Sequence, residues 1–167
     1  MLDPGTLIAG RYEIQHHLGS GGSGSVYAAT DRTTKRCVAV KLFEDGRNWN
    51  RTETARFKIE TSVAGLANSE HIVQVFDAGF DPQAQYAFLV MEFLDGQNLQ
   101  ELIEQSGPLQ ASVAVEYLRQ TASGLDKAHA WNDEAGRPSP ILHLDLKPAN
   151  VYCTRSRDWA DGGGVSG

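Results

Sequence analysis

Alternating apolar and polar residues predict a strand near the start of the chain. In RYEIQHHL, residues 11–18, one face carries Tyr12, Ile14, His16 and Leu18, while polar or charged residues take the other. Two further segments, residues 26–30 and 36–43, are rich in β-branched and apolar residues. A run of glycine and serine separates residues 11–18 from the second segment, so the glycines are expected inside a β-hairpin, with a third strand after it.

The pattern changes over residues 50–67, where apolar residues recur at helical spacing. Asn50, followed three residues later by Glu53, resembles a capping box and predicts a helix start. Residues 70–80 and 85–94 return to strand character. The second of these is almost continuously apolar, which is typical of a central strand.

Helices dominate the remaining periodic part of the chain. Residues 98–105 predict a short helix with Asn98 as cap and Glu101 at the third helical position. Residues 111–130 predict a long helix with one apolar stripe from Val113 to Ala128. We therefore expect five strands with one helix among them, followed by helices.

Composition fits an ordinary globular domain. The chain has 167 residues, 41% of them apolar and 22% charged. A net charge of −6 disfavours broad binding to nucleic acid or anionic lipid. Cys37 and Cys153 lack metal-site spacing and are expected to be reduced and buried. Residues 1–10 show no signal peptide, and no window is long enough for a membrane span, so a cytoplasmic location is expected.

The glycine-rich segment has the form GxGxxGxV. Its fixed positions are Gly19, Gly21, Gly24 and Val26. Glycines let a backbone turn sharply and bring its N–H groups against phosphate oxygens, although a run of small residues is often a plain turn. A dinucleotide-binding fold would need a helix directly afterwards, and a P-loop would need Gly-Lys-Ser/Thr. A strand follows instead, as in proteins that cover nucleotide phosphates with a hairpin.

Lys41 ends the apolar segment VAVK. Its ammonium group must reach solvent or find an anionic partner. Glu60 falls on the apolar face of the predicted helix over residues 50–67 and is either such a partner or a residue on a solvated rim. Paired with Glu60, Lys41 could be held against the α- and β-phosphates of a nucleotide.

Six segments, in order and in register, resemble the bacterial (eukaryotic-like, Hanks-type) serine/threonine protein kinases. They are GSGGSGSV, VAVK, RFKIE, EHIVQVFDAG, FLVMEFLDGQNL and HLDLKPANV. The resemblance implies an α+β, kinase-like fold, with a five-stranded antiparallel N-lobe sheet and one helix. The first helices and the catalytic loop of an incomplete helical C-lobe would follow.

Domain boundaries follow from the same resemblance. Residues 1–10 would be an N-terminal extension, 11–94 the N-lobe and 95–157 a partial C-lobe. Residues 158–167, which are rich in glycine, would be a flexible tail.

The resemblance implies roles for the loop HLDLKPANV. Asp145 would accept or orient the proton of a substrate serine or threonine hydroxyl. Lys147 would offset charge on the transferred phosphoryl group, and Asn150 would offer an amide oxygen to Mg²⁺. The implied partners are ATP and a protein substrate.

The resemblance also implies a nucleotide site, with Met91 as gatekeeper behind the adenine and Glu92 to Leu94 along its edge. The full implied set of nucleotide contacts is Leu18, Gly19, Gly21, Gly24, Val26, Ala39, Lys41, Met91, Glu92 and Leu94.

The chain departs from the family pattern after Asn150. Leu144 stands where most active members have arginine, and Asp161-Gly162-Gly163 is at best a degenerate copy of the Asp-Phe-Gly motif, with Asp161 as its metal ligand. An activation segment is missing. We therefore expect an ATP-binding kinase fragment with little phosphotransfer as this 167-residue chain. The alternative is a non-catalytic nucleotide-binding or partner-binding pseudokinase module.

Overall fold

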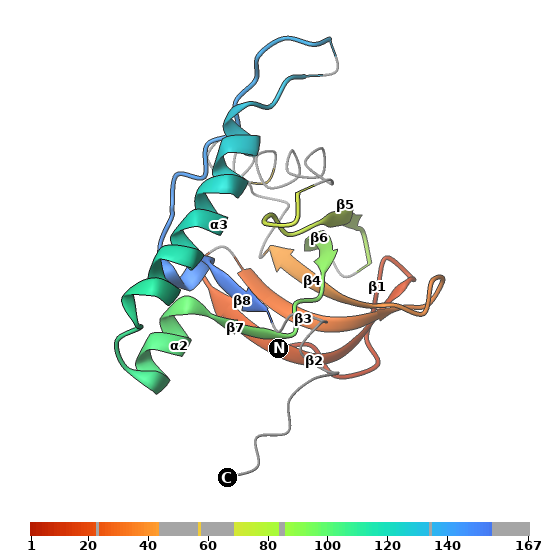
Figure 1. Cartoon of the computed structure of the whole chain (residues 1–167). Helices are drawn as coiled ribbons and strands as arrows, with labels where there is room; N and C mark the ends of the chain where they lie inside the picture. Colours follow the sequence, from red (N-terminus) through yellow and green to blue (C-terminus); the bar gives the residue numbers. More distant parts are fainter. Residues whose placement is uncertain (23, 44–56, 58–68, 84–85, 134, 155–167) are drawn as a thin grey trace. The chain divides into compact units, whose positions relative to one another are not determined.

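Six strands form one antiparallel sheet in the order β1-β2-β3-β4-β6-β5 (Figure 1). Their bounds are β1 Leu7–Ile8, β2 Tyr12–Gly21, β3 Gly24–Asp31, β4 Cys37–Phe43, β5 Val75–Asp81 and β6 Tyr86–Glu92. The computed structural model describes residues 1–22, 24–43, 57, 69–83, 86–133 and 135–154. The five strands expected from the sequence are present. The two residues of β1, which pair with the start of β2, are too few to show an alternation.

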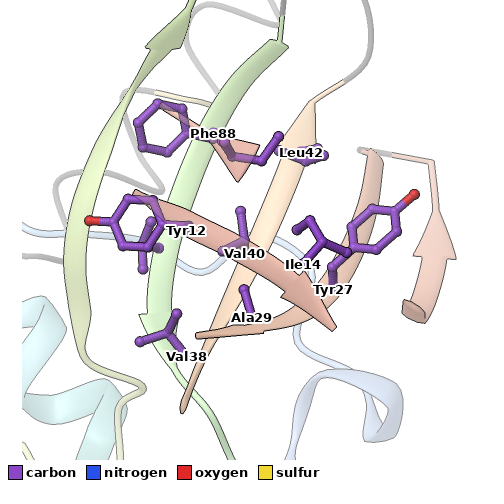
Figure 2. Packing of buried hydrophobic residues seen from close by; sticks show 10 residues of the cluster. Tyr12, Ile14, Tyr27, Ala29, Val38, Val40, Leu42 and Phe88 are labelled. Atoms are coloured by element: carbon purple, nitrogen blue, oxygen red, sulfur yellow. The ribbon is translucent and has the colours of Figure 1, made fainter. Parts of the chain in front are cut away.

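One face of this sheet carries the main hydrophobic core (Figure 2). Its buried members are Ile8, Tyr12, Ile14, Tyr27, Ala29, Val38, Val40, Leu42, Phe88 and Val90. Side chains two residues apart on a strand share a face, which is why Val38, Val40 and Leu42 all enter this core from β4. Each large apolar side chain buried here stabilises the fold by about 1.5–3 kcal/mol.

Strand β2 does not keep a simple alternation. Irregularities in its pairing with β3 fall between Ile14 and His16 and between His17 and Gly19. An extra residue at a bulge shifts the side chains that follow it. The prediction that His16 and Leu18 share the buried face with Tyr12 is therefore wrong, since both are exposed.

Hydrogen bonds within a polar cluster link Arg11, just before β2, to Asp31 at the end of β3. The Arg11 guanidinium donates to both carboxylate oxygens of Asp31, from Nε at 2.9 Å and from Nη2 at 2.7 Å. Asp31 also accepts from the Thr33 backbone N–H and the Thr34 hydroxyl. Arg11 and these further donors hold the pKa of Asp31 well below its usual range. The buried carboxylate is thus satisfied in its ionised form.

The short helix α2, Leu99–Ser106, begins and ends where the sequence predicts. Asn98 accepts from the Glu101 backbone N–H, while the Glu101 side chain accepts from the Asn98 backbone N–H, completing the capping box. Gly107 ends the helix with a positive φ of 78°, a conformation that favours glycine. Two short strands, β7 Gly96–Asn98 and β8 Tyr152–Thr154, pair beside the 3₁₀ turn η2, Pro148–Asn150.

The long helix α3, Ala111–His129, confirms the predicted helix. The predicted apolar stripe is only partly buried: Ala128 is buried, Tyr117, Thr121 and Leu125 are half-buried, and Val113 is exposed. Gly124, which lies outside the stripe, is also buried, and a Cβ there would lie 2.9 Å from the His71 carbonyl oxygen. The large apolar residues of α3 that are exposed are Val113, Val115 and Leu118, so only Val113 of the predicted stripe is among them.

The chain forms two units, which are described separately. The first unit contains Met1–Phe93 and Ala122–Leu142, and the second contains Leu94–Thr121 and His143–Gly167. The domain boundaries expected from the sequence stay predictions. Among the described residues, no helix is both long and apolar enough to cross a membrane.

The two cysteines and the helix expected over residues 50–67 can also be compared with the structure. Cys37 is exposed at the first position of β4, so its predicted burial is wrong, whereas Cys153 is half-buried; both thiols are free. The helix expected over residues 50–67 lies outside the described residues except for Phe57, whose ring packs edge-on against Phe43 at 5.3 Å between centroids.

Candidate functional site

The register of the sheet collects four predicted nucleotide contacts on one face. Val26 of β3 and Leu89 of β6 lie directly opposite Lys41 of β4, and Ala39 lies opposite Met91. Directly opposed residues point to the same side of a sheet, as do residues two apart on a strand. We call this side the Lys41 face, defined by Val26, Ala39, Lys41, Phe43, Leu89 and Met91. It is the side opposite the main core.

The Lys41 ammonium group lies beside an aromatic ring on this face. Lys41 is half-buried, and its Nζ lies 4.9 Å from the centroid of the Phe43 ring. Phe43, Ala87 and Leu89 form a second buried cluster, with Phe57 packed against it. Lys41 thus lies beside apolar side chains on a half-buried part of the sheet, where a lysine stem can pack while its ammonium group meets a polar partner. Glu60, its predicted partner, lies outside the described residues.

The glycine-rich segment forms the hairpin between β2 and β3. Gly19 pairs with Val26, and Gly21 pairs with Gly24 at the end of the ladder. Gly24 has a φ of +129°, and a Cβ there would lie 2.0 Å from the Leu42 carbonyl oxygen. This position accepts only glycine without a shift of the backbone. Leu18, the residue before the first glycine of the motif, is 45% exposed.

Beyond the gatekeeper position the chain leaves the sheet. The Glu92 N–H donates to the Gln74 carbonyl at 2.8 Å, so this donor is already engaged. Leu94 is the first residue of the second unit and is half-buried. The predicted contacts at the adenine edge thus fall at the end of β6 and in the segment that follows it.

The second unit brings Asp145, Lys147 and Asn150 into direct contact. Lys147 Nζ lies 2.8 Å from Asp145 Oδ2. The Asn150 amide nitrogen donates to the Asp145 carbonyl at 2.8 Å and to Oδ2 at 3.2 Å. The three side chains meet because η2 turns the chain by one 3₁₀ turn, with Pro148 fixing its start.

The carboxylate of Asp145 is stabilised in its ionised form. The hydrogen bond from Lys147 is the main cause that lowers the pKa of Asp145, and Asn150 and His143 lower it further. Since the carboxylate is largely exposed, solvent screens its ion pair with Lys147, which contributes little to folding stability. The arrangement supplies a proton acceptor beside a cation, which suits the transfer of an anionic group to a hydroxyl.

The backbone around Asp145 contains two features without a predicted role. Leu144 adopts a positive φ of 57° and is 80% exposed. The His143 carbonyl accepts the Asp145 N–H at 2.8 Å, closing a tight turn that presents the carboxylate. In the sequence, only the position of His143, two residues before Asp145, could have indicated that its carbonyl closes this turn.

Asn150 offers an amide oxygen, a kind of ligand that Mg²⁺ accepts. Because the Asn150 amide nitrogen is occupied by Asp145, its amide oxygen remains the free end of the group. Among the described residues, no group of three or more histidines, cysteines and carboxylates could hold a metal by itself. Asp161, the other predicted metal ligand, lies outside the described residues.

A cavity of about 430 Å³ opens within the second unit. Its lining residues are Asp95, Gly96, Gln97, Leu102, Gln105, Tyr117, Cys153 and Thr154. None of these is a predicted site residue, so the cavity is separate from the contacts described above.

Comparison with known proteins gives a consistent result. The family model described as "Protein kinase domain" matches residues 12–159. The chain is 33% identical over 150 residues to a probable serine/threonine-protein kinase of Clostridium acetobutylicum, covering 90% of this chain and 21% of that protein. It is 37% identical over 147 residues to the serine/threonine-protein kinase PknD of Mycobacterium tuberculosis, covering 88% and 21%.

Solved structures agree with the sequence matches. The kinase domain of Mycobacterium tuberculosis PknI superimposes with a TM-score of 0.74 at 27% identity, covering 92% of this chain and 59% of that chain. The present chain therefore spans about three-fifths of that domain and about a fifth of each of the two curated relatives.

Proposed function

This chain belongs to the protein kinase domain family, among relatives that are bacterial serine/threonine kinases, and from that premise we propose that it binds ATP with Mg²⁺ on the Lys41 face. In a complete kinase domain the same residues would serve transfer of the γ-phosphate to serine or threonine hydroxyls of a protein. The observation that supports this most is the register that aligns Val26 with Lys41 and Ala39 with Met91.

Each element of the proposed site has a definite task. Ala39, Val26 and Met91 give the apolar surface that an adenine ring requires, and Lys41 gives the cation for the α- and β-phosphates. The hairpin glycines, Gly19, Gly21 and Gly24, let backbone N–H groups approach the phosphates. Leu18 would flank the ring, and Glu92 and Leu94 would face its polar edge.

The loop around Asp145 would serve the transfer itself. Asp145 would accept the proton of the attacking hydroxyl, which its ionised state allows at neutral pH. Lys147 would balance the negative charge of the phosphoryl group while Asn150 holds Mg²⁺ through its amide oxygen. Bound Mg²⁺ would neutralise part of the phosphate charge.

Thermal unfolding with and without nucleotide tests the binding step. A ligand at a hundred times its Kd stabilises a protein by about 2.7 kcal/mol, so ATP with Mg²⁺ should raise Tm clearly. Lys41→Ala should remove most of that rise, whereas Arg36→Ala, a change of a basic residue just before β4, should preserve it. Absence of any rise in the unaltered chain would overturn the proposal.

A second candidate is a non-catalytic nucleotide-binding module. It is favoured by Leu144, an exposed apolar residue where the resemblance implies an arginine. A phosphotransfer assay with labelled ATP and a basic protein substrate separates the two candidates. Turnover that Asp145→Asn abolishes would support catalysis, while ATP binding without turnover would support the second candidate.

A further inference from the structure

A chain of hydrogen bonds crosses the glycine hairpin on the side away from the Lys41 face. His17 Nε2 lies 2.8 Å from Ser20 Oγ, and Ser20 Oγ lies 2.9 Å from Ser25 Oγ. Ser25 is next to Val26 on β3 and opposite Leu42 on β4, so its side chain points to the side opposite Lys41. We call His17, Ser20 and Ser25 the hairpin clasp.

The clasp is anchored to the main core through one aromatic contact. The His17 ring packs edge-on against Tyr27, with 5.2 Å between ring centroids. Tyr27 is 3% exposed and belongs to the buried core cluster. A continuous path therefore runs from the core through His17 and Ser20 to Ser25, which lies next to Gly24 near the hairpin tip.

Each side chain of the hairpin clasp can find a hydrogen-bond partner within it. A hydroxyl can donate one hydrogen bond and accept others, so the chain can run in either direction, with neutral His17 as acceptor or as donor. Without it, a tip rich in glycine would sample many backbone conformations, because glycine is the least restricted residue. The clasp joins the two strands across that tip at Ser20 and Ser25.

From this geometry we propose that the clasp is a positioning device, which holds the glycine hairpin in one conformation before nucleotide binds and thereby strengthens binding of the triphosphate. An ordered binding element loses less conformational entropy when its ligand arrives. The ligand in this inference rests on the proposed function, whereas the ordering of the hairpin does not.

Ser20→Ala is the sharpest test, because it removes both hydrogen bonds. We expect it to weaken the affinity for ATP at least about fivefold, the effect of a single net hydrogen bond, and to leave the affinity for adenosine unchanged. Adenosine lacks the phosphates that the hairpin would contact. Ser20→Thr keeps the hydroxyl and should restore ATP affinity.

His16→Ala is the matched control. His16 is exposed on the same strand, and its side chain makes no hydrogen bond or ion pair with any residue that the structure describes. It should bind ATP as the unaltered chain does. Equal ATP affinity in Ser20→Ala and His16→Ala would overturn the proposal, and so would a parallel loss of ATP and adenosine affinity.

A second measurement keeps this test independent of the proposed function. The backbone heteronuclear NOE of Gly19, Gly21 and Gly24 in the nucleotide-free chain reports hairpin order directly. Lower values in Ser20→Ala than in His16→Ala would support the ordering role even if the unaltered chain failed to bind ATP. Unchanged values would overturn it.

Discussion

The two units of the chain are stabilised in different ways. The sheet of the first unit carries a core of ten buried residues, from Ile8 to Val90. In the second unit, none of the described residues is buried, and short polar contacts set the local structure. Lys41 therefore rests on an apolar framework, whereas Asp145 is oriented by its neighbours in sequence. Stability and chemistry should respond to different substitutions in the two units.

Truncating a side chain of the sheet core should lower the free energy of unfolding more than any other substitution considered. Ile14 is fully buried, so Ile14→Ala deletes apolar contacts and leaves a cavity. We expect the free energy of unfolding to fall by about 4 kcal/mol, within the range of such core truncations. Urea denaturation followed by circular dichroism measures it.

Leu118→Ala is the comparison variant from the second unit. Leu118 is 68% exposed on α3, and its truncation should change the free energy of unfolding by less than about 0.5 kcal/mol. If the two truncations cost the same, the contrast between the units is wrong.

The same contrast explains how far the sequence could predict the fold. Alternation predicts the strand over residues 11–18, and apolar or β-branched composition predicts those over residues 26–30, 36–43 and 85–94. The caps of α2 are predicted from Asn98 and Glu101. The bulges after Ile14 are invisible to such a pattern, because they depend on pairing with β3. The burial of Gly124 on α3 is equally invisible to the pattern, because it depends on His71, a residue distant in sequence.

The residues of the predicted site also fall into two groups, those whose proximity follows from local spacing and those brought together by strand pairing. The contacts among Asp145, Lys147 and Asn150 form within six residues, so local spacing is a sufficient guide to their proximity. The common face of Val26, Lys41 and Met91 arises from register between three strands, which the resemblance implied and spacing alone could not give. The hairpin clasp had no sequence signal, because His and Ser beside glycine are common in turns.

Substitution of Gly24 should have an intermediate effect on the free energy of unfolding. In Gly24→Ala the new methyl group would press on the Leu42 carbonyl oxygen, at a φ that L residues rarely adopt. Backbone strain of this kind costs about 1–3 kcal/mol, so we expect a loss of about 2 kcal/mol in urea denaturation.

Gly22→Ala is its matched control, since a Cβ at Gly22 meets nothing within 4 Å. Its unfolding free energy should stay within about 0.5 kcal/mol of the unaltered chain. Equal losses in the two variants would mean that hairpin flexibility, and not the contact with β4, makes glycine necessary at Gly24.

The smallest effect on folding, but a clear one on chemistry, is expected from Lys147→Ala. Without the ammonium group 2.8 Å away, the Asp145 carboxylate loses its main stabilising partner, and its pKa should rise toward the ordinary value for aspartate. Carboxyl ¹³C shifts followed through a pH titration measure this directly, and Lys147→Arg, which keeps the positive charge, should leave the pKa low. Because the pair is exposed and screened by solvent, the free energy of unfolding should hardly change. A large loss of stability would show that exposed ion pairs support the second unit as strongly as the buried core supports the first. An unchanged pKa would assign the ionised state of Asp145 to Asn150 and His143, the two remaining groups that favour the charged form.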